Sequence, residues 1–230
     1  MKPIQDTEPV VQHYLYGHVS KEIWATERLP LAAGFVFIKP LPITIMDTTS
    51  QGLSTSRIQL TNEQICFWAQ KYDARYKEKD ALDEAEAKEW FLTHHYLDRE
   101  TFLKIARWKS PRPIKHYLSK YNDDQTLKEL SDYCFNTKNE LLRIELLQVI
   151  HGVSYPLASA ILHFAFPDIY PIIDFRALWS LGWENTKNYD FDYWNTYCIR
   201  IRSIAKNTGL PIRTIDKALW QYSKENQLTK

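Results

Sequence analysis

The sequence feature that most constrains the fold is a central stretch in which two apolar helical patterns flank a short turn. Apolar residues recur at helical spacing over residues 141–150, and the pattern stops at Gly152, which adopts positive φ without a steric penalty from a Cβ atom. Ser154 is a favoured N-cap residue, and the helical pattern after it runs until Pro167. The stretch therefore predicts a helix, a hairpin turn and a second helix.

The hairpin turn also predicts a site for an anion. Gly152, Val153, Ser154 and Tyr155 place successive backbone N–H groups at the start of the second helix. Unpaired donors and the helix dipole favour negative charge at such a place. We expect these four residues to contact a DNA phosphate.

A carboxylate follows the second helix. The chain passes through Pro171, Ile172 and Ile173 to Asp174, directly before another helical pattern that ends at Gly182. An Asp in this position is an ordinary N-cap. A capping role and a catalytic role are compatible, because a hydrogen bond to a carboxylate favours its charged form and holds it in place.

Together, the hairpin and the carboxylate resemble the helix-hairpin-helix superfamily of DNA base-excision glycosylases. Residues 150–154 match the hairpin of that superfamily, and residues 171–174 resemble the segment that carries its catalytic Asp. The resemblance implies an all-α fold with two closely packed helical lobes, in which 1–230 form one compact unit and 138–182 hold the hairpin and the catalytic segment. It also implies that Asp174 is catalytic.

The resemblance further implies a monofunctional DNA glycosylase. In members that also cut the DNA backbone, a Lys follows the hairpin and attacks the sugar, but Pro156 stands at that position here. The implied reaction is to flip a modified or damaged base out of the duplex and to hydrolyse its N-glycosidic bond with water, in DNA repair or in defence against modified viral DNA. Lys109 stays open as a displaced nucleophile.

No iron-sulfur cluster and no other required cofactor is expected. Many members of the superfamily hold a cluster on four closely spaced cysteines, whereas Cys66, Cys134 and Cys198 are too few and too scattered. A monovalent cation at the hairpin stays an open alternative that the resemblance implies, although Ser154 replaces the second glycine of the superfamily's hairpin and so weakens the case for it. Without clustered Cys or carboxylates, no zinc site is expected either.

Charge is distributed unevenly along the chain, although the net charge is only +1. Residues 101–120 carry several Lys and Arg residues, no Asp or Glu, and three aromatic residues, a pattern typical of a surface that follows phosphates and stacks a base. Within and beyond this region we predict Trp108, Lys109, Arg112 and Arg176 as base-pocket or DNA contacts. The alternative is a core Trp with cations on a solvated helix face.

The rest of the chain sets broader expectations. It has no apolar run long enough to span a membrane and no signal-peptide pattern at Met1, so we expect a cytoplasmic monomer that binds double-stranded DNA and no membrane. Residues 31–45 predict one short strand or an extended arm. Two other functions stay open: a non-catalytic helix-hairpin-helix DNA-binding protein, and a structural or interaction protein.

Overall fold

The computed structural model describes residues 56–75, 77–184 and 188–228. All of these residues belong to one compact unit within Pro40–Lys230. The strand or arm predicted over residues 31–45 lies outside the described residues. Whether 1–230 form one compact unit stays a prediction.

The predicted all-α fold is confirmed, since the described residues form ten α-helices and no β-strand. The helices are α1 (Asn62–Asp73), α2 (Glu78–Thr93), α3 (Arg99–Lys109), α4 (Ile114–Tyr117), α5 (Asp124–Asn136), α6 (Glu140–Leu147), α7 (Tyr155–Ala165), α8 (Phe175–Ser180), α9 (Phe191–Thr208) and α10 (Ile212–Asn226). Helices α4 and α5 have no counterpart among the predicted helices.

Local sequence signals explain where several helices begin and end. Asp98 caps α3, because its side chain accepts a hydrogen bond of 2.8 Å from the backbone N–H of Thr101. The same helix ends at Ser110, as expected for the residue before Pro111. Helix α9 ends at Gly209, whose φ of +69° lies in the left-handed region.

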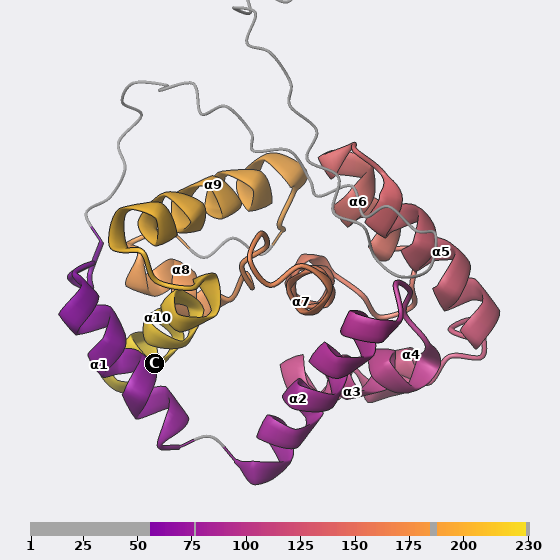
Figure 1. The fold of residues 1–230 in the computed structure, drawn as a ribbon, viewed down its shortest axis with the longest axis horizontal. Helices are drawn as coiled ribbons and strands as arrows, with labels where there is room; N and C mark the ends of the chain where they lie inside the picture. The colour runs from indigo at the N-terminus through magenta and orange to yellow at the C-terminus, as the bar shows by residue number, and fades with distance from the viewer. Residues whose placement is uncertain (1–55, 76, 185–187, 229–230) are drawn as a thin grey trace, which may run out of the picture. The chain divides into compact units, whose positions relative to one another are not determined.

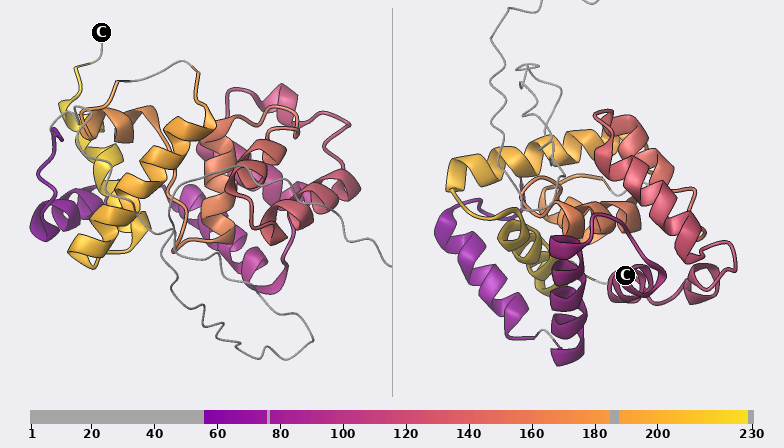
Figure 2. Two further views of the ribbon diagram at one scale, coloured as in Figure 1. Left: turned by 90° about the horizontal axis from the view of Figure 1, so that it is seen from above. Right: turned by 45° about the vertical axis from the view of Figure 1, so that its right-hand side comes forward.

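Helix α7 forms the centre of the described fold. All of its residues from 157 to 164 are buried, and α2, α3 and α6 pack against it. Figure 1 shows α7 end-on, with α1, α8, α9 and α10 on one side and α2 to α6 on the other. Figure 2 shows the same two groups from above. This central position explains why α7 is mostly apolar, with Ser159 and His163 as its buried polar residues.

The predicted helix-hairpin-helix is formed by α6, the turn 148–154 and α7. Gly152 has φ +87°, as its place in a tight turn requires. A Cβ atom on Gly152 would lie 2.8 Å from the Cβ atom of His116 and 2.8 Å from a ring carbon of Tyr117. The turn therefore needs a glycine both for its backbone conformation and for its close contact with α4.

Within residues 56–75, 77–184 and 188–228, no helix is both long and apolar enough to cross a membrane.

Candidate active site

The segment that carries Asp174 is held in place by side chains from other helices. The backbone N–H of Ile172 donates a hydrogen bond of 2.9 Å to Oδ2 of Asp216, which comes from α10. The carbonyl oxygen of Ile172 accepts a hydrogen bond of 3.1 Å from the hydroxyl group of Tyr197, which comes from α9. Both backbone groups of Ile172 are thus paired with buried side chains.

The next residue is held in the same way. The backbone N–H of Ile173 donates to Oγ of Ser159 on α7 at 3.1 Å, and its carbonyl oxygen accepts from Nζ of Lys109 on α3 at 3.2 Å. These bonds fix the chain directly before Asp174, which is the N-cap residue of α8. The position of Asp174 is therefore set by α3, α7, α9 and α10 together.

Both oxygens of the Asp174 carboxylate accept a hydrogen bond. Oδ1 caps α8 by accepting from the backbone N–H of Arg176 at 3.0 Å. Oδ2 lies 2.7 Å from Nζ of Lys109 in an ion pair whose side chains are 19% and 9% exposed, respectively. The predicted capping role of Asp174 is thus present in the structure. The carboxylate stays partly exposed to solvent.

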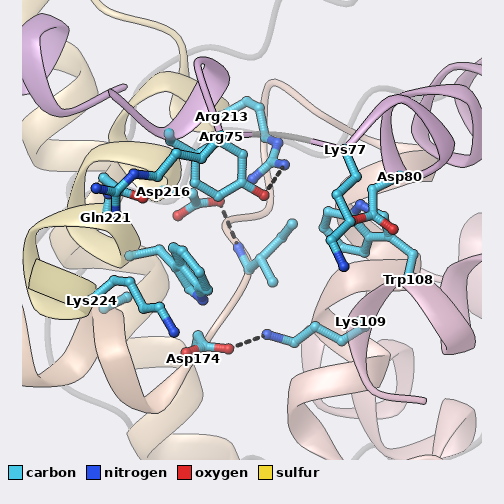
Figure 3. Close-up of a pocket in the computed structure, with 14 residues that line it drawn as sticks. Arg75, Lys77, Asp80, Trp108, Lys109, Asp174, Arg213, Asp216, Gln221 and Lys224 are labelled. Atoms are coloured by element: carbon cyan, nitrogen blue, oxygen red, sulfur yellow. Dashed lines mark hydrogen bonds and ion pairs between the residues drawn. The ribbon is translucent and has the colours of Figure 1, made fainter. Parts of the chain in front are cut away.

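Asp174 and Lys109 line a cavity of about 360 Å³ (Figure 3). In Figure 3, Lys77, Asp80 and Trp108 stand opposite Asp216, Gln221 and Lys224, with Asp174 facing Lys109 below them. The described residues that line the cavity are Tyr72, Arg75, Lys77, Asp80, Trp108, Lys109, Ile172, Asp174, Ala177, Arg213, Asp216, Trp220, Gln221 and Lys224. A volume of this size is within the usual range of small-molecule pockets.

Aromatic rings and a paired arginine form the inner wall of the cavity. The guanidinium of Arg213 lies 5.4 Å from the ring centroid of Tyr72 and 5.3 Å from that of Trp108. It also pairs with the buried carboxylate of Glu84 on α2, through hydrogen bonds of 3.1 Å and 2.9 Å. Burial is the largest single influence on the pKa of Arg213 and lowers it. The hydrogen bonds and the charge of Glu84 act in the opposite direction, and the pKa of Arg213 is raised as a result. This pair joins α2 to α10 behind the cavity.

Asp216 is a second carboxyl group in the cavity wall, and it is 5% exposed. Burial raises the pKa of Asp216 to about 7, while the hydrogen bond from the Ile172 N–H and the charges of Arg213 and Lys109 act in the opposite direction. Its Oδ1 atom lies 3.5 Å from the hydroxyl oxygen of Tyr197. Asp216 is thus a carboxyl group that gains and loses its proton near neutral pH.

The hairpin presents free backbone donors, as predicted for an anion site. No described residue accepts a hydrogen bond from the backbone N–H of Gly152, Ser154 or Tyr155. The N–H of Val153 is used within the turn, where it donates to the carbonyl oxygen of Ile150 at 3.0 Å. Ser154 occupies the N-cap position of α7, but its side chain makes no capping hydrogen bond.

A buried asparagine holds the hairpin, and the sequence analysis did not predict it. The side chain of Asn122 is 1% exposed. Its Oδ1 accepts from the backbone N–H of His151 at 2.9 Å, and its Nδ2 donates to the carbonyl oxygen of the same residue at 3.0 Å. Asn122 also bonds the carbonyl oxygen of Tyr117 at 3.1 Å. One side chain thereby ties the hairpin to the end of α4.

The residues predicted as base-pocket or DNA contacts fall in two places. Trp108 and Lys109 line the cavity. Arg112 is exposed and lies outside the cavity lining. Arg176 also lies outside it and places its guanidinium 5.4 Å from the ring centroid of Trp220, on the other side of the cavity wall. The hairpin residues do not line this cavity, and the roles of all these residues as DNA contacts stay predictions.

Asp216 and Arg213 line the cavity, and Glu84 pairs with Arg213 behind it, but none of the three was predicted as a site residue. A signal for Asp216 was present, because α10 buries Ile212, Ile215 and Leu219, and Asp216 falls on that same buried side. An acidic residue on an apolar helix face needs a partner or a function. The partner of Arg213 was not visible in the sequence, because Glu84 lies 129 residues earlier.

Metal ligands are not clustered in the described residues, where no group of three or more His, Cys, Asp or Glu side chains could hold a metal ion. The three cysteines are free thiols. Burial raises the pKa of Cys134 to about 12 and that of Cys198 further still, so these two are small buried side chains rather than reactive thiolates.

The chain matches no known protein family and no curated protein sequence. Among solved structures, it is similar to the crystal structure of the 8-oxoguanine glycosylase/lyase of Methanocaldococcus jannaschii in complex with a 15mer DNA containing 8-oxoguanine. The two proteins share 21% sequence identity with a TM-score of 0.40, and the match covers 73% of this chain and 82% of that chain.

Proposed function

We propose that this protein is a monofunctional DNA glycosylase that acts on a modified or damaged base in double-stranded DNA and leaves an abasic site. The observation that carries the proposal is the position of Asp174. Its carboxylate is fixed by two hydrogen bonds at the edge of a cavity with aromatic walls. Helix α7 joins the segment before it to a hairpin in which the backbone N–H groups of Gly152, Ser154 and Tyr155 are free.

The chemistry of base excision needs a carboxylate in such a place. Breaking an N-glycosidic bond leaves positive charge on C1′ and the ring oxygen of the sugar. A fixed carboxylate stabilises that charge more in the transition state than in the ground state, which is the condition for catalysis. Asp174 supplies this charge, and a water molecule beside it completes the hydrolysis.

The nucleotide must leave the base stack before this bond is accessible. The cavity of about 360 Å³ gives the flipped base a place between Trp108 and Trp220. The free N–H groups of Gly152, Ser154 and Tyr155 hold a phosphate of the distorted strand. The exposed side chains of Lys77 and Lys224 at the rim add positive charge near the DNA.

The test is base release from duplexes that each carry one modified base, under single-turnover conditions, with alkali added afterwards to cut at abasic sites. The panel includes oxidised, alkylated, mismatched and bulky enzymatically modified bases. Asp174→Asn is the informative variant, because Asn caps helices as well as Asp does, whereas it removes the charge. We expect release to slow by about 100-fold or more, the usual loss for a transition-state charge.

Asp98→Asn is the matched control, since it changes another capping carboxylate that does not line the cavity. Its rate should equal that of the unchanged protein. If no duplex loses a base, or if Asp174→Asn is as fast as the unchanged protein, the glycosylase proposal fails. Salt-dependent duplex binding without base release would then identify a non-catalytic helix-hairpin-helix DNA-binding protein.

One contact favours a second candidate function, a glycosylase that also has lyase activity. Nζ of Lys109 lies in the cavity, 2.7 Å from the carboxylate of Asp174. After losing a proton, this amine could attack C1′ of an abasic sugar, expel water and form an imine. Asp174 is near enough to take the proton.

Sodium borohydride and an abasic duplex separate the two functions without knowledge of the excised base. The monofunctional enzyme gives no covalent adduct, whereas a Lys109 imine is reduced to a stable protein–DNA link. Lys109→Arg is the diagnostic variant, because a guanidinium keeps the ion pair with Asp174 but is not a nucleophile at neutral pH. If the unchanged protein forms an adduct and Lys109→Arg does not, the protein is a lyase. If neither protein forms an adduct and Lys109→Arg still releases a base, the protein is a monofunctional hydrolase.

A further inference from the structure

The cavity contains a second carboxyl group that the proposed function does not use. Asp216 lines the cavity on the α10 wall, beside Trp220 and Gln221. Its Oδ2 accepts the N–H of Ile172, two residues before Asp174 along the chain. Asp80, Asp174 and Asp216 are the three described carboxyl groups that line the cavity, and one backbone segment connects Asp174 and Asp216.

The surroundings of Asp174 and Asp216 differ. Asp174 has a cation at 2.7 Å, in Lys109. Asp216 is buried, and no described cation lies within ion-pair distance of it. The charged and titratable groups around it are Arg213 on α10, Lys109 on α3, and Tyr197 and Cys198 on α9. Burial outweighs these groups and raises the pKa of Asp216 to about 7. When the surroundings of two carboxyl groups push their pKa values apart in this way, the group with the higher pKa serves as the acid and the other stays charged.

We propose that Asp216 is the proton donor to the departing base, and that the cavity acts on bases that are neutral when bound rather than on cationic N-alkylated bases. This inference rests on the proposed glycosylase function. It adds a second catalytic group to Asp174 and names the class of substrate.

In the proposed hydrolysis, protons and electrons are conserved. The bond between C1′ and the base nitrogen breaks, and its electron pair goes to the base. The carboxylic acid of Asp216 gives its proton to a nitrogen or oxygen atom of the base, which leaves as a neutral molecule. Water adds its hydroxyl group to C1′, and the proton that this water releases restores the carboxylic acid of Asp216.

A proton donor matters only for some substrates. A neutral base would leave as an anion, so protonation lowers the barrier to its departure. A base alkylated on a ring nitrogen is already cationic and leaves as a neutral molecule without an acid. The presence of an acid in the wall thus indicates a neutral base.

The cations around the cavity favour the same class. The ammonium of Lys109 offsets the attraction of Asp174 for a cationic base. Aromatic rings would otherwise attract such a base. However, Arg213 already lies 5.3 Å from the ring centroid of Trp108, and Arg176 lies 5.4 Å from that of Trp220. A positively charged base would therefore meet Lys109 and Arg213 in the cavity wall, with Arg176 behind Trp220.

The test compares Asp216→Asn with the unchanged protein in single-turnover base release. Two kinds of duplex are used: those of the panel with a neutral modified base, and one with 7-methylguanine, which is cationic. Asn still offers an oxygen to the N–H of Ile172, so the segment that carries Asp174 keeps its hydrogen bond. Asp168→Asn, which changes an exposed carboxyl group, is the matched control.

We expect Asp216→Asn to lose about 100-fold or more on the neutral base, the usual contribution of general acid catalysis. Because the pKa of Asp216 is about 7, the rate of base release by the unchanged protein should fall as the pH rises above that value. The residual rate of Asp216→Asn should not fall over the same pH range. The inference is overturned if the variant is within about three-fold of the unchanged protein with the same pH profile. It is also overturned if 7-methylguanine is released faster than every neutral base.

Two outcomes separate this inference from the proposed function. If the unchanged protein releases no base from any duplex, the glycosylase proposal fails and Asp216 loses its role with it. If it releases a base and Asp216→Asn does so equally well, only the inference fails. If Asp216→Asn does not fold, infrared spectra of the unchanged protein test the protonation of Asp216 instead. The inference requires the band of a buried carboxylic acid that disappears between pH 6 and pH 8. The absence of this band refutes the inference.

Discussion

Replacing Asp216 by Asn should change how the stability of the protein depends on pH. Burial raises the pKa of Asp216 from the ordinary value of 3.8 to about 7 in the folded protein. Between these values the folded chain holds a proton at Asp216 that the unfolded chain has released. The free energy of unfolding therefore contains a contribution that is present at low pH and is lost as the pH rises towards 7.

The size of the effect follows from the two pKa values. A separation from 3.8 to about 7 corresponds to roughly 4 kcal/mol, lost at up to about 1.4 kcal/mol per pH unit. His163 acts in the opposite direction over a similar range, because burial lowers its pKa to about 4 from 6.5. The folded protein therefore excludes a proton at His163 that the unfolded chain binds, and this contribution to stability is lost as the pH falls. The two effects largely cancel in the unchanged protein.

The assay must therefore measure a difference between variants. Urea unfolding is followed by circular dichroism from pH 4.5 to pH 8.5 for the unchanged protein and for Asp216→Asn, which contains the same His163. The stability of the unchanged protein relative to Asp216→Asn should fall with rising pH and level off above about pH 7, by the reasoning of linked protonation. Asp168→Asn should show no such trend relative to the unchanged protein. A difference that is constant with pH, or that grows as the pH rises, would refute the assignment of Asp216 as a neutral acid.

Three further predictions concern the hairpin and the wall behind the cavity. Gly152→Ala should destabilise the protein by about 1–3 kcal/mol, because φ is positive and the added Cβ atom would lie 2.8 Å from α4 atoms; urea unfolding measures the loss, and fluorescence anisotropy of a labelled duplex should show weaker binding. Asn122→Leu should cost about 1–3 kcal/mol by leaving buried backbone groups unpaired, and it should weaken duplex binding at low salt. Glu84→Gln should cost about 3–5 kcal/mol, because it leaves the guanidinium of Arg213 buried without its carboxylate, whereas Glu225→Gln, at a surface ion pair, should cost less than about 1 kcal/mol.

The helical pattern of the chain was largely predictable from its sequence. The limits of α7 follow from Ser154 before it and Pro167 after it, and its apolar residues indicate its central position. Helix α5 was missed although it carries an ordinary local signal, since Asp123 caps it by accepting from the N–H of Thr126 at 2.8 Å. A local signal therefore accounts for α5, one of the two helices that were not predicted.

The candidate site was predictable only where it is local in sequence. Asp174 stands out because it follows the hairpin and precedes a helix. Lys109 was singled out for its charge, but its contact with Asp174 joins residues 65 positions apart and depends on how α3 packs. Asp216 joins the site from α10, 44 positions from the residue whose N–H it accepts. Pairings over such distances arise from tertiary packing, which single-sequence patterns do not specify.

The contacts of Asp174 bear on how the proposed reaction would be shared between residues. Its Oδ1 is held by the N–H of Arg176 and its Oδ2 by Lys109. A carboxylate fixed at both oxygens is well placed to stabilise a neighbouring positive charge, because no reorganisation is needed when that charge develops. It is less free to turn and deliver a proton to a base on the other side of the sugar. In the proposed reaction that task would fall to a second group in the cavity wall, and among the described residues Asp216 is the buried acid that lines the cavity.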